Sequence, residues 1–260
     1  MGTWQPPRLA VSLHRLAGGL LDLVYPPRCL VCERYDSPPL CETCSAAFTA
    51  LPEPVCDACG RPIEPDQTGP CRTCEAHHEA TGSPFAFEAA RAAGIFEGPL
   101  RLALHRLKYH QGESLGESLG SYLANRLVVD RLFGSERLTG LDWVAAVPMH
   151  PRKERSRGFN QARLLAAPVA EMLGLPLLPS PALRRIRSRP AQVGLSADLR
   201  RRNLREAFQA TDRSNAPIAG RGVLLIDDVF TTGATVEACA AALREAGTSR
   251  VLVATLAGGG

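Results

Sequence analysis

Two adjacent carboxylates precede a turn rich in hydroxyl groups in the run Ile226-Asp-Asp-Val-Phe-Thr-Thr-Gly-Ala-Thr235. The threonine hydroxyls and the backbone around Gly233 can donate hydrogen bonds to a phosphate, whereas Asp227 and Asp228 would repel one. The carboxylates can instead accept hydrogen bonds from sugar hydroxyls or face a divalent cation. A helix cap beside two solvated aspartates is the simpler alternative, but carboxylates at the end of a buried strand are unfavourable without a partner. The run therefore predicts a site for a ligand that has a phosphate at one end and a diol beside it.

This run lies between an expected strand and an expected helix. Residues 223–226 are apolar and of strand length, as in a parallel strand that is buried on both faces. From Thr232 onward, apolar residues recur at helical spacing, at Val236, Cys239, Ala240 and Leu243. A helix N-terminus offers unpaired N–H groups and the positive end of the helix dipole, which suit a phosphate. Cys239 lies on the apolar side of this helix and is expected in the core, not as a nucleophile.

The cysteines point to a second kind of site. Eight of the nine lie before residue 75, in four C-x2-C pairs: Cys29/Cys32, Cys41/Cys44, Cys56/Cys59 and Cys71/Cys74. This spacing lets two thiolates bind one tetrahedral zinc ion, so the pairs predict two structural Zn2+ sites. The simplest assignment joins neighbouring pairs along the chain, and an interleaved assignment is the alternative. His77 and His78 are interpreted as surface residues.

The cysteine-rich segment is acidic. Residues 29–80 contain nine Asp or Glu residues against three Lys or Arg residues, and four thiolates on each zinc add further negative charge. Such a surface repels phosphates, so this segment is interpreted as a structural or protein-docking module and not as a nucleic-acid finger. Its small hydrophobic core implies that the metals supply much of its folding free energy.

The remainder of the 260-residue chain alternates between strand and helix patterns, which favours an α/β domain with a mostly parallel sheet. Strands are expected at 85–96 (one bent strand or an antiparallel pair), 142–147, 175–178, 223–226 and 251–256, and helices at 100–108, 115–132, 159–173, 195–208 and from 232. The strand 142–147 is followed by a basic loop with four cations, Arg152, Lys153, Arg155 and Arg157. If strand 142–147 neighbours strand 223–226, this loop overhangs the predicted phosphate site, where its cations would meet a polyanion.

These motifs resemble those of known proteins. The run 226–235 resembles the phosphoribosyl pyrophosphate (PRPP) signature of type I phosphoribosyltransferases. The whole chain is similar to the ComF family of competence-associated proteins. The resemblance is carried by the cysteine pairs, Lys108-Tyr109, the Val147-Pro-Met-His-Pro…Arg157-Gly-Phe-Asn-Gln turn, and the series Gln192, Leu195, Arg200, Asn203, Ala207 and Phe208.

The resemblance implies a fold, a domain organisation and a site. The expected organisation is an N-terminal helical segment (1–24), a double zinc-ribbon module (25–82), and a phosphoribosyltransferase-like domain (83–260) with a mostly parallel sheet and flanking helices. Asp227 and Asp228 would hold the ribose and act in catalysis, and Mg2+ would accompany PRPP. The other implied PRPP-binding residues are Val229, Thr231, Thr232, Gly233, Ala234, Thr235, Pro148, Met149, His150, Arg152, Arg155 and Arg157.

The family resemblance also implies a role in natural transformation. We expect either phosphoribosyl transfer to an acceptor that the sequence does not identify, or a non-catalytic protein that senses PRPP or a nucleotide, or binds single-stranded DNA. The zinc module would dock a competence helicase or another protein of the uptake machinery. No apolar stretch reaches the roughly eighteen residues that span a bilayer, so a cytoplasmic protein that is not an integral membrane protein is expected.

Overall fold

The computed structural model describes residues 26–259, except 68, 110–111, 130–131, 134–135, 187–205 and 213–215. The predicted N-terminal helical segment 1–24 and most of the predicted helix 195–208 lie outside these residues. Within the described part of the chain, no helix is both long enough and apolar enough to cross a membrane.

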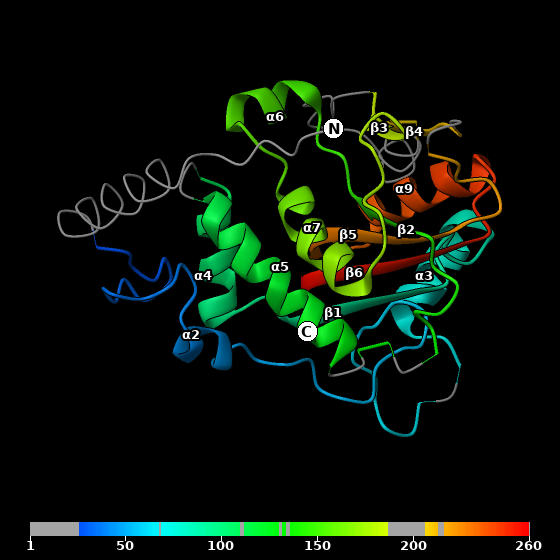
Figure 1. Ribbon diagram of the computed structural model, residues 1–260. Helices are drawn as coiled ribbons and strands as arrows, with labels where there is room; N and C mark the ends of the chain where they lie inside the picture. Colours follow the sequence, from blue (N-terminus) through cyan, green and yellow to red (C-terminus); the bar gives the residue numbers. More distant parts are fainter. Residues whose placement is uncertain are drawn as a thin grey trace, which may run out of the picture.

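A four-stranded parallel sheet forms the centre of the molecule (Figure 1). Its strands are β1 (Ala89–Ile95), β6 (Arg250–Gly258), β5 (Gly222–Phe230) and β2 (Trp143–Ala146), in that spatial order. Their continuous apolar runs suit burial on both faces of a parallel sheet. The strand predictions at 142–147, 223–226 and 251–256 are confirmed, and the segment 85–96 forms one strand and not a pair.

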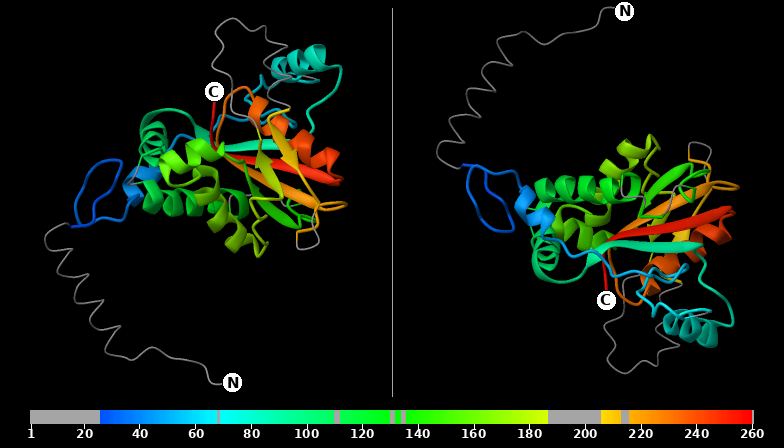
Figure 2. Two further views of the ribbon diagram at one scale, coloured as in Figure 1. Left: turned by 90° about the horizontal axis from the view of Figure 1, so that it is seen from above. Right: turned by 90° about the horizontal axis from the view of Figure 1, so that it is seen from below.

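Helices cover both faces of the sheet, and the side chains of the central strands alternate between them (Figure 2). Leu224 and Ile226 pack in the core that also contains residues of α4 (Gly98–Leu107), α5 (Gly112–Val128) and α7 (Gln161–Leu173). Val223 and Leu225 pack in the core under α9 (Ala234–Glu245). Cys239 is fully buried in this second core, as predicted. The fold is therefore an α/β layered domain of the expected class.

The cysteine-rich segment lies along the outer edge of β1. Its two short helices, α2 (Glu42–Ala46) and α3 (Arg72–Thr81), each begin directly after a cysteine. The N–H of Ile95 donates to the Thr49 carbonyl at 2.8 Å, and the N–H of Ala90 donates to the Ala58 carbonyl at 2.7 Å. These bonds occupy N–H groups on the free side of β1, which would otherwise be an open sheet edge.

Three predictions around the second half of the chain are wrong. The basic loop after β2 is a helix, α6 (Pro151–Arg157), because Pro151 starts it and the His150 side chain accepts a hydrogen bond from the N–H of Arg152. Segment 175–178 makes only an isolated bridge, between Leu177 and Val144. Phe208, predicted at the end of a helix, belongs to a strand.

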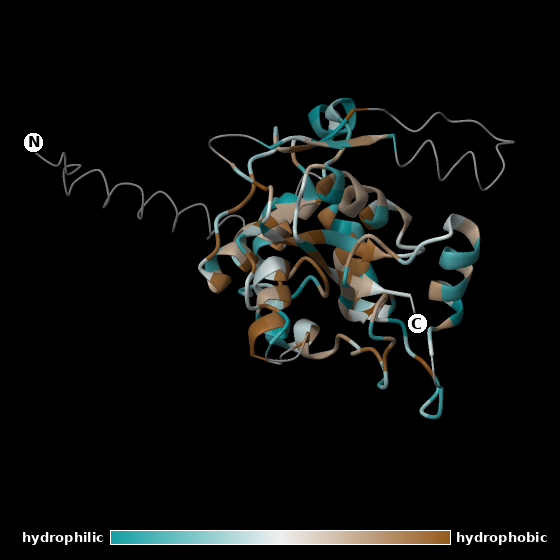
Figure 3. Cartoon of the chain, turned by 90° about the vertical axis from the view of Figure 1, so that its right-hand side faces the viewer, coloured by the Kyte–Doolittle hydropathy of each residue, from teal (hydrophilic) through white to brown (hydrophobic). Residues whose placement is uncertain are grey.

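That strand, β4 (Phe208–Ala210), pairs antiparallel with β3 (Leu183–Arg185) in a separate two-stranded sheet. Figure 3 shows α6 at the top of the molecule as a mainly hydrophilic helix, in contrast to the apolar strands below it. The two-stranded sheet β3–β4 and the helix α6 both lie above the carboxyl end of β2, and both add cations to that side of the central sheet.

Candidate functional site

The two carboxylates lie inside a strand and not after it. β5 continues to Phe230, and Asp227 is opposite Thr255 in the register of β5 with β6. The Oδ1 atom of Asp227 accepts a hydrogen bond from the N–H of Asp228 at 2.9 Å. The Nζ atom of Lys108, at the C-cap of α4, lies 3.6 Å from Oδ2 of Asp228. A cation from the first half of the chain thus faces the acidic pair.

The environment shifts the proton affinity of Asp227. Burial, and next the negative charge of Asp228, raise the pKa of Asp227 to about 8. The backbone hydrogen bond from Asp228 and the Lys108 ammonium oppose this rise but do not cancel it. At neutral pH the Asp227 carboxyl is therefore mostly protonated in the free protein, and it can donate a hydrogen bond as well as accept one.

Residues 231–233, called the 231–233 turn below, connect β5 to α9. Gly233 has φ +76° and is the N-cap of α9, and a Cβ atom at this position would lie 2.8 Å from the Phe230 ring. Only glycine therefore fits without strain. The Thr232 hydroxyl accepts a hydrogen bond from the N–H of Ala234 at 3.4 Å. The turn leads directly into the N-terminus of a twelve-residue helix, which is the arrangement that suits a phosphate.

The turn after β2 lies beside the acidic pair. β2 pairs parallel with β5, and the N–H of Val147 donates to the Ile226 carbonyl at 2.9 Å. The two strands are therefore neighbours, which is the condition under which the segment after β2 would overhang the predicted phosphate site. Asn160 fixes this turn from α7, because its Nδ2 donates to the Val147 carbonyl at 3.0 Å while its Oδ1 accepts from the N–H of Ala162 at 3.1 Å.

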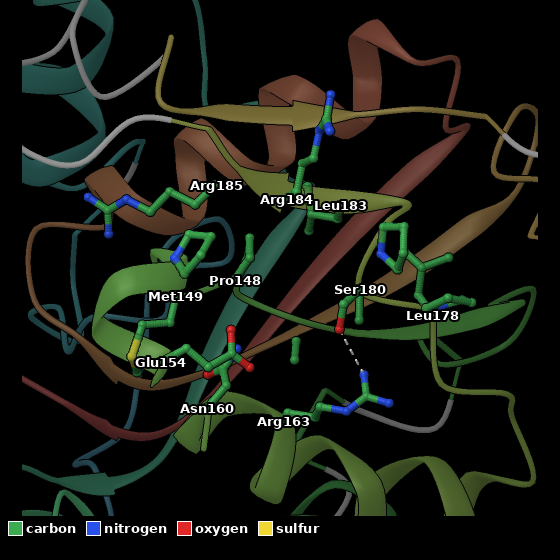
Figure 4. Close-up of a pocket in the computed structure, with 15 residues that line it drawn as sticks. Pro148, Met149, Glu154, Asn160, Arg163, Leu178, Ser180, Leu183, Arg184 and Arg185 are labelled. Carbon is green, nitrogen blue, oxygen red and sulfur yellow. Dashed lines mark hydrogen bonds between the residues drawn. The ribbon is translucent and has the colours of Figure 1, made fainter. Parts of the chain in front are cut away.

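A pocket of about 340 Å³ lies at the carboxyl end of β2 (Figure 4). Pro148 and Met149 form part of its wall, as do Leu183 and Arg184 of β3. The Nη1 atom of Arg163 donates to the Ser180 hydroxyl at 3.3 Å within this lining. The pocket is thus an apolar cavity with cations at its margin, beneath α6 and β3.

The sequence-predicted residues do not all converge. The acidic pair and the 231–233 turn form one continuous strand–turn–helix unit, and Pro148 and Met149 line the adjacent pocket. By contrast, Arg152, Arg155 and Arg157 of α6 are not among the residues that line it. The side chains of Arg152 and Arg155 are exposed, with no ion-pair partner among the described residues.

The eight paired cysteines form two tetrads in the local assignment, so the interleaved alternative is wrong. Within each tetrad the four sulfur atoms lie within 4.8 Å of one another. The first ribbon contains Cys29, Cys32, Cys41 and Cys44, and the second ribbon contains Cys56, Cys59, Cys71 and Cys74. Sulfur pairs lie 3.8 Å apart in the first ribbon, and 3.3 and 3.7 Å apart in the second. A tetrahedron with Zn–S bonds of about 2.3 Å has edges of about 3.8 Å, so both donor sets fit Zn2+.

Backbone donors favour the ligating form of these cysteines. The N–H groups of Val31 and Cys41 lie 3.4 and 3.5 Å from the sulfur of Cys29. Burial raises the pKa of Cys29, but these and other backbone hydrogen bonds outweigh burial and lower it to about 6. The same balance lowers the pKa of Cys56, in the second ribbon, to about 7. One thiol in each tetrad is thus a ready thiolate.

Several residues near the site carried no role in the sequence interpretation. Lys108 belongs to a sequence motif without a predicted role, and no residue pattern points to Arg61, whose guanidinium reaches the Thr231 carbonyl from the second ribbon. The interpretation of His77 as a surface residue is wrong. Its ring stacks on Phe85 at 3.8 Å, and its Nε2 lies 3.8 Å from an oxygen of Glu237 in the first turn of α9.

Comparison with known proteins gives matches along most of the chain. Two family models match, one described as a double zinc ribbon domain over residues 20–75 and one described as a phosphoribosyl transferase domain over residues 161–260. The DNA utilization protein YhgH of Escherichia coli O157:H7 is 33% identical over 217 residues, which cover 82% of this chain and 88% of that protein. Competence protein F of Haemophilus influenzae is 28% identical over 221 residues, with coverages of 84% and 90%. Competence protein ComFC of Bacillus subtilis is 23% identical over 208 residues, with coverages of 80% and 79%.

Among solved structures, the adenine phosphoribosyltransferase of Saccharomyces cerevisiae matches 55% of this chain and 69% of that chain at 18% identity, with a TM-score of 0.32. A glutamine PRPP amidotransferase from B. subtilis matches 56% of this chain and 27% of that chain at 23% identity, with a TM-score of 0.36.

Proposed function

The chain belongs to the ComF family, and from this premise we propose that it binds PRPP with Mg2+ at the carboxyl end of β5 and serves in DNA uptake during natural transformation. One observation carries the proposal: two adjacent carboxylates near the end of β5 are followed, two residues later, by a turn that ends with Gly233 at the N-terminus of α9. A diol and a phosphate on one ligand match these two neighbouring groups.

Each part of the proposed site has a distinct task. Asp227 and Asp228 hold the ribose hydroxyls, and the turn and first helical residues hold the 5-phosphate. The residues proposed to hold the 5-phosphate are Thr231, Thr232, Gly233 and Thr235, and Val229 and Ala234 complete the PRPP-binding segment. The turn Pro148, Met149 and His150 faces the pyrophosphate, with the cations Arg152, Arg155 and Arg157 behind it. When bound, Mg2+ neutralises pyrophosphate charge, and the acidic pair provides the oxygen ligands that this ion prefers.

The chemistry that fits this arrangement is phosphoribosyl transfer. The nucleophilic atom of an acceptor forms a bond to C1 of the ribose, and the bond from C1 to the pyrophosphate oxygen breaks, so that pyrophosphate leaves with the bonding electron pair. Positive charge develops on the ribose ring, and the negative charge of the Asp228 carboxylate stabilises it. The cations of α6 attract the departing pyrophosphate. The pocket beside Pro148 and Met149 offers space for the acceptor next to the ribose position.

The link to DNA rests on the relatives, whose names refer to DNA utilization and competence. One feature of this chain favours a second candidate function, a non-catalytic adaptor that senses PRPP or binds single-stranded DNA. The exposed side chains of Arg152, Lys153 and Arg155 form a basic face on α6 without ion-pair partners in the described residues. A phosphate backbone would neutralise such a face. In this candidate, the acidic zinc module docks a protein of the uptake machinery.

Calorimetric titration of the zinc-loaded protein with PRPP and Mg2+ tests the proposal, with the double variant Asp227→Asn/Asp228→Asn as its control. Saturable binding that the double variant loses supports the PRPP site. The proposal would be refuted if PRPP produced no heat of binding and if added ribose 5-phosphate did not compete in the titration. Titration with single-stranded DNA at two salt concentrations then separates the candidates, because binding by α6 must weaken steeply as salt rises.

A further inference from the structure

The two zinc ribbons contain the same knuckle, and only the second one reaches the candidate site. Cys29 and Cys56 begin equivalent C-x2-C turns, and in each ribbon an arginine follows five residues after this cysteine. The N–H of Cys29 donates to the Arg34 carbonyl at 2.9 Å, and the N–H of Cys56 donates to the Arg61 carbonyl at 2.7 Å. Arg34 is exposed and its side chain has no partner in the described residues, whereas Arg61 extends toward α9.

The main chain of Arg61 is fixed on two sides. On one side, its carbonyl accepts a hydrogen bond from the N–H of Cys56, the first cysteine of the second tetrad. On the other side, Gly60 packs directly on β1, since a Cβ atom there would lie 2.3 Å from the Ala90 carbonyl oxygen. The base of the Arg61 side chain is therefore anchored to the zinc knuckle and to the central sheet together.

The Arg61 guanidinium contacts the 231–233 turn. Its Nη2 donates to the Thr231 carbonyl, and its Nε is buried with no hydrogen-bond partner in the described residues. Since C=O and N–H of one planar peptide point in opposite directions, holding the Thr231 carbonyl fixes the Thr232 N–H on the side away from Arg61. A phosphate needs N–H groups that are already oriented, because ordering them on binding costs free energy.

A second contact from the same ribbon supports the helix behind the turn. His77, three residues after the ligand Cys74, lies against Glu237 in the first turn of α9, and Glu237 also accepts from the N–H of Ala86 at 2.8 Å. Aromatic contacts continue from Phe85 through Phe87 to Phe230, whose ring lies under Gly233. The second ribbon thus braces both the turn and the start of α9.

Docking of the ribbon does not require Arg61. The Arg91 guanidinium, buried in β1, donates to the carbonyls of Cys56 and Asp57 at 3.3 and 3.0 Å, and Arg137 contacts the Asp57 carboxylate at 3.1 Å. The backbone bond from Ala90 to Ala58 adds to these contacts. The side chain of Arg61 is therefore free for another task, and it is one of only three basic residues in the acidic segment 29–80.

We propose that Arg61 is a positioning residue through which the second zinc ribbon holds the 231–233 turn in its phosphate-binding conformation. This rests on the proposed function, since the phosphate is that of PRPP. The first ribbon has no such role, although it carries Arg34 at the position equivalent to Arg61.

The first test compares Arg61→Ala with Arg34→Ala, its internal counterpart, in the full zinc-loaded chain. We expect Arg61→Ala to weaken Mg2+–PRPP binding about tenfold, as for the loss of one charge-assisted hydrogen bond. Arg34→Ala should remain within about twofold of the unchanged protein, because its charge is exposed and remote. Methylguanidinium added to Arg61→Ala should restore part of the affinity, which a loss of folding would not allow. The affinity of Arg61→Lys for Mg2+–PRPP should lie between those of Arg61→Ala and Arg34→Ala.

The second test needs no PRPP. Hydrogen exchange of the amides in 231–237 should be faster in Arg61→Ala than in Arg34→Ala, at equal zinc content and melting temperature. Equal exchange rates in Arg61→Ala and Arg34→Ala would overturn the proposal, and so would equal affinities of these two variants for Mg2+–PRPP. Release of zinc from both Arg61→Ala and Arg61→Lys would also overturn it. If the unchanged protein does not bind PRPP, the proposed function fails, and exchange alone still decides whether Arg61 orders the turn.

Discussion

Binding of Mg2+–PRPP should release a proton from Asp227. Its pKa is raised to about 8 in the free protein by burial and by the charge of Asp228. The ribose diol of the bound ligand and the Mg2+ that accompanies it both favour the ionised carboxylate, so we expect binding of Mg2+–PRPP to lower the pKa of Asp227. The perturbation is a change of pH, applied to the unchanged protein and to Asp227→Asn.

The size of the effect follows from the titration curve. With a pKa of about 8, about nine-tenths of the free sites are protonated at pH 7 and about one-tenth at pH 9, so binding should release about 0.9 proton at pH 7. Apparent affinity should then rise about tenfold from pH 7 to pH 9 and level off above that. The phosphates of the ligand contribute little in this range, because their second pKa lies near about 6.

Calorimetry in buffers of different ionisation enthalpy measures the released proton directly. The free protein provides an independent check, because a carboxyl whose pKa is higher in the folded than in the unfolded state binds more protons when folded. Its contribution to stability is greatest at low pH and declines as pH rises from about 4 to about 8. Asp227→Asn should remove this decline. Binding without proton release, together with an unchanged stability slope in Asp227→Asn, would refute the assigned environment of this carboxyl.

Three other predictions, the first with Gly174→Ala as its control, concern the 231–233 turn and the zinc ribbons. Gly233→Ala should weaken PRPP binding and lower the free energy of unfolding by about 1–2 kcal/mol, because its φ is +76° and the Phe230 ring blocks a Cβ atom. Gly174→Ala, which has φ +64° but no neighbour within 4 Å, should lower stability in chemical denaturation and leave PRPP affinity unchanged. Arg91→Ala should destabilise the protein by about 2 kcal/mol and make the second ribbon sensitive to limited proteolysis, because it removes the cation that holds Cys56 and Asp57. Metal analysis should find two zinc ions per chain, and a ratio below two would contradict the fit of the tetrads.

The parts that could be predicted from the sequence are those encoded by local spacing. The C-x2-C pairs and the strand–turn–helix around Gly233 each depend on residues close together in the chain, so residue type and periodicity were sufficient. The continuous apolar runs indicated parallel strands that are buried on both faces, but not which strands are neighbours in the sheet. β5 proved longer than predicted, because the carboxylates of Asp227 and Asp228 interrupt the apolar run without interrupting the pairing with β6.

The parts that could not be predicted depend on long-range contacts or on caps that resemble loops. Arg61 and Thr231 are 170 residues apart, and no periodicity connects them. β3 and β4 pair across a long segment, which gives neither strand a local signal. In α6, prolines at 148 and 151 and four nearby cations resemble a loop, yet Pro151 at the first helical position and Gly158 in the left-handed region are ordinary helix ends.

The position of the zinc ribbons explains why a metal module accompanies this sheet. β1 is an edge strand, and the cysteine-rich segment occupies its free side through the carbonyls of Thr49, between the two tetrads, and Ala58, in the first turn of the second tetrad. Gly94 packs so tightly there that a Cβ atom would lie 2.8 Å from the Thr49 oxygen. Without this segment, β1 would present unpaired backbone groups, a known template for aggregation. Because many short cysteine-rich segments fold only with their metal, we expect zinc binding and completion of the sheet to be coupled. The metal sites therefore stabilise the same structure that presents the acidic pair and the 231–233 turn.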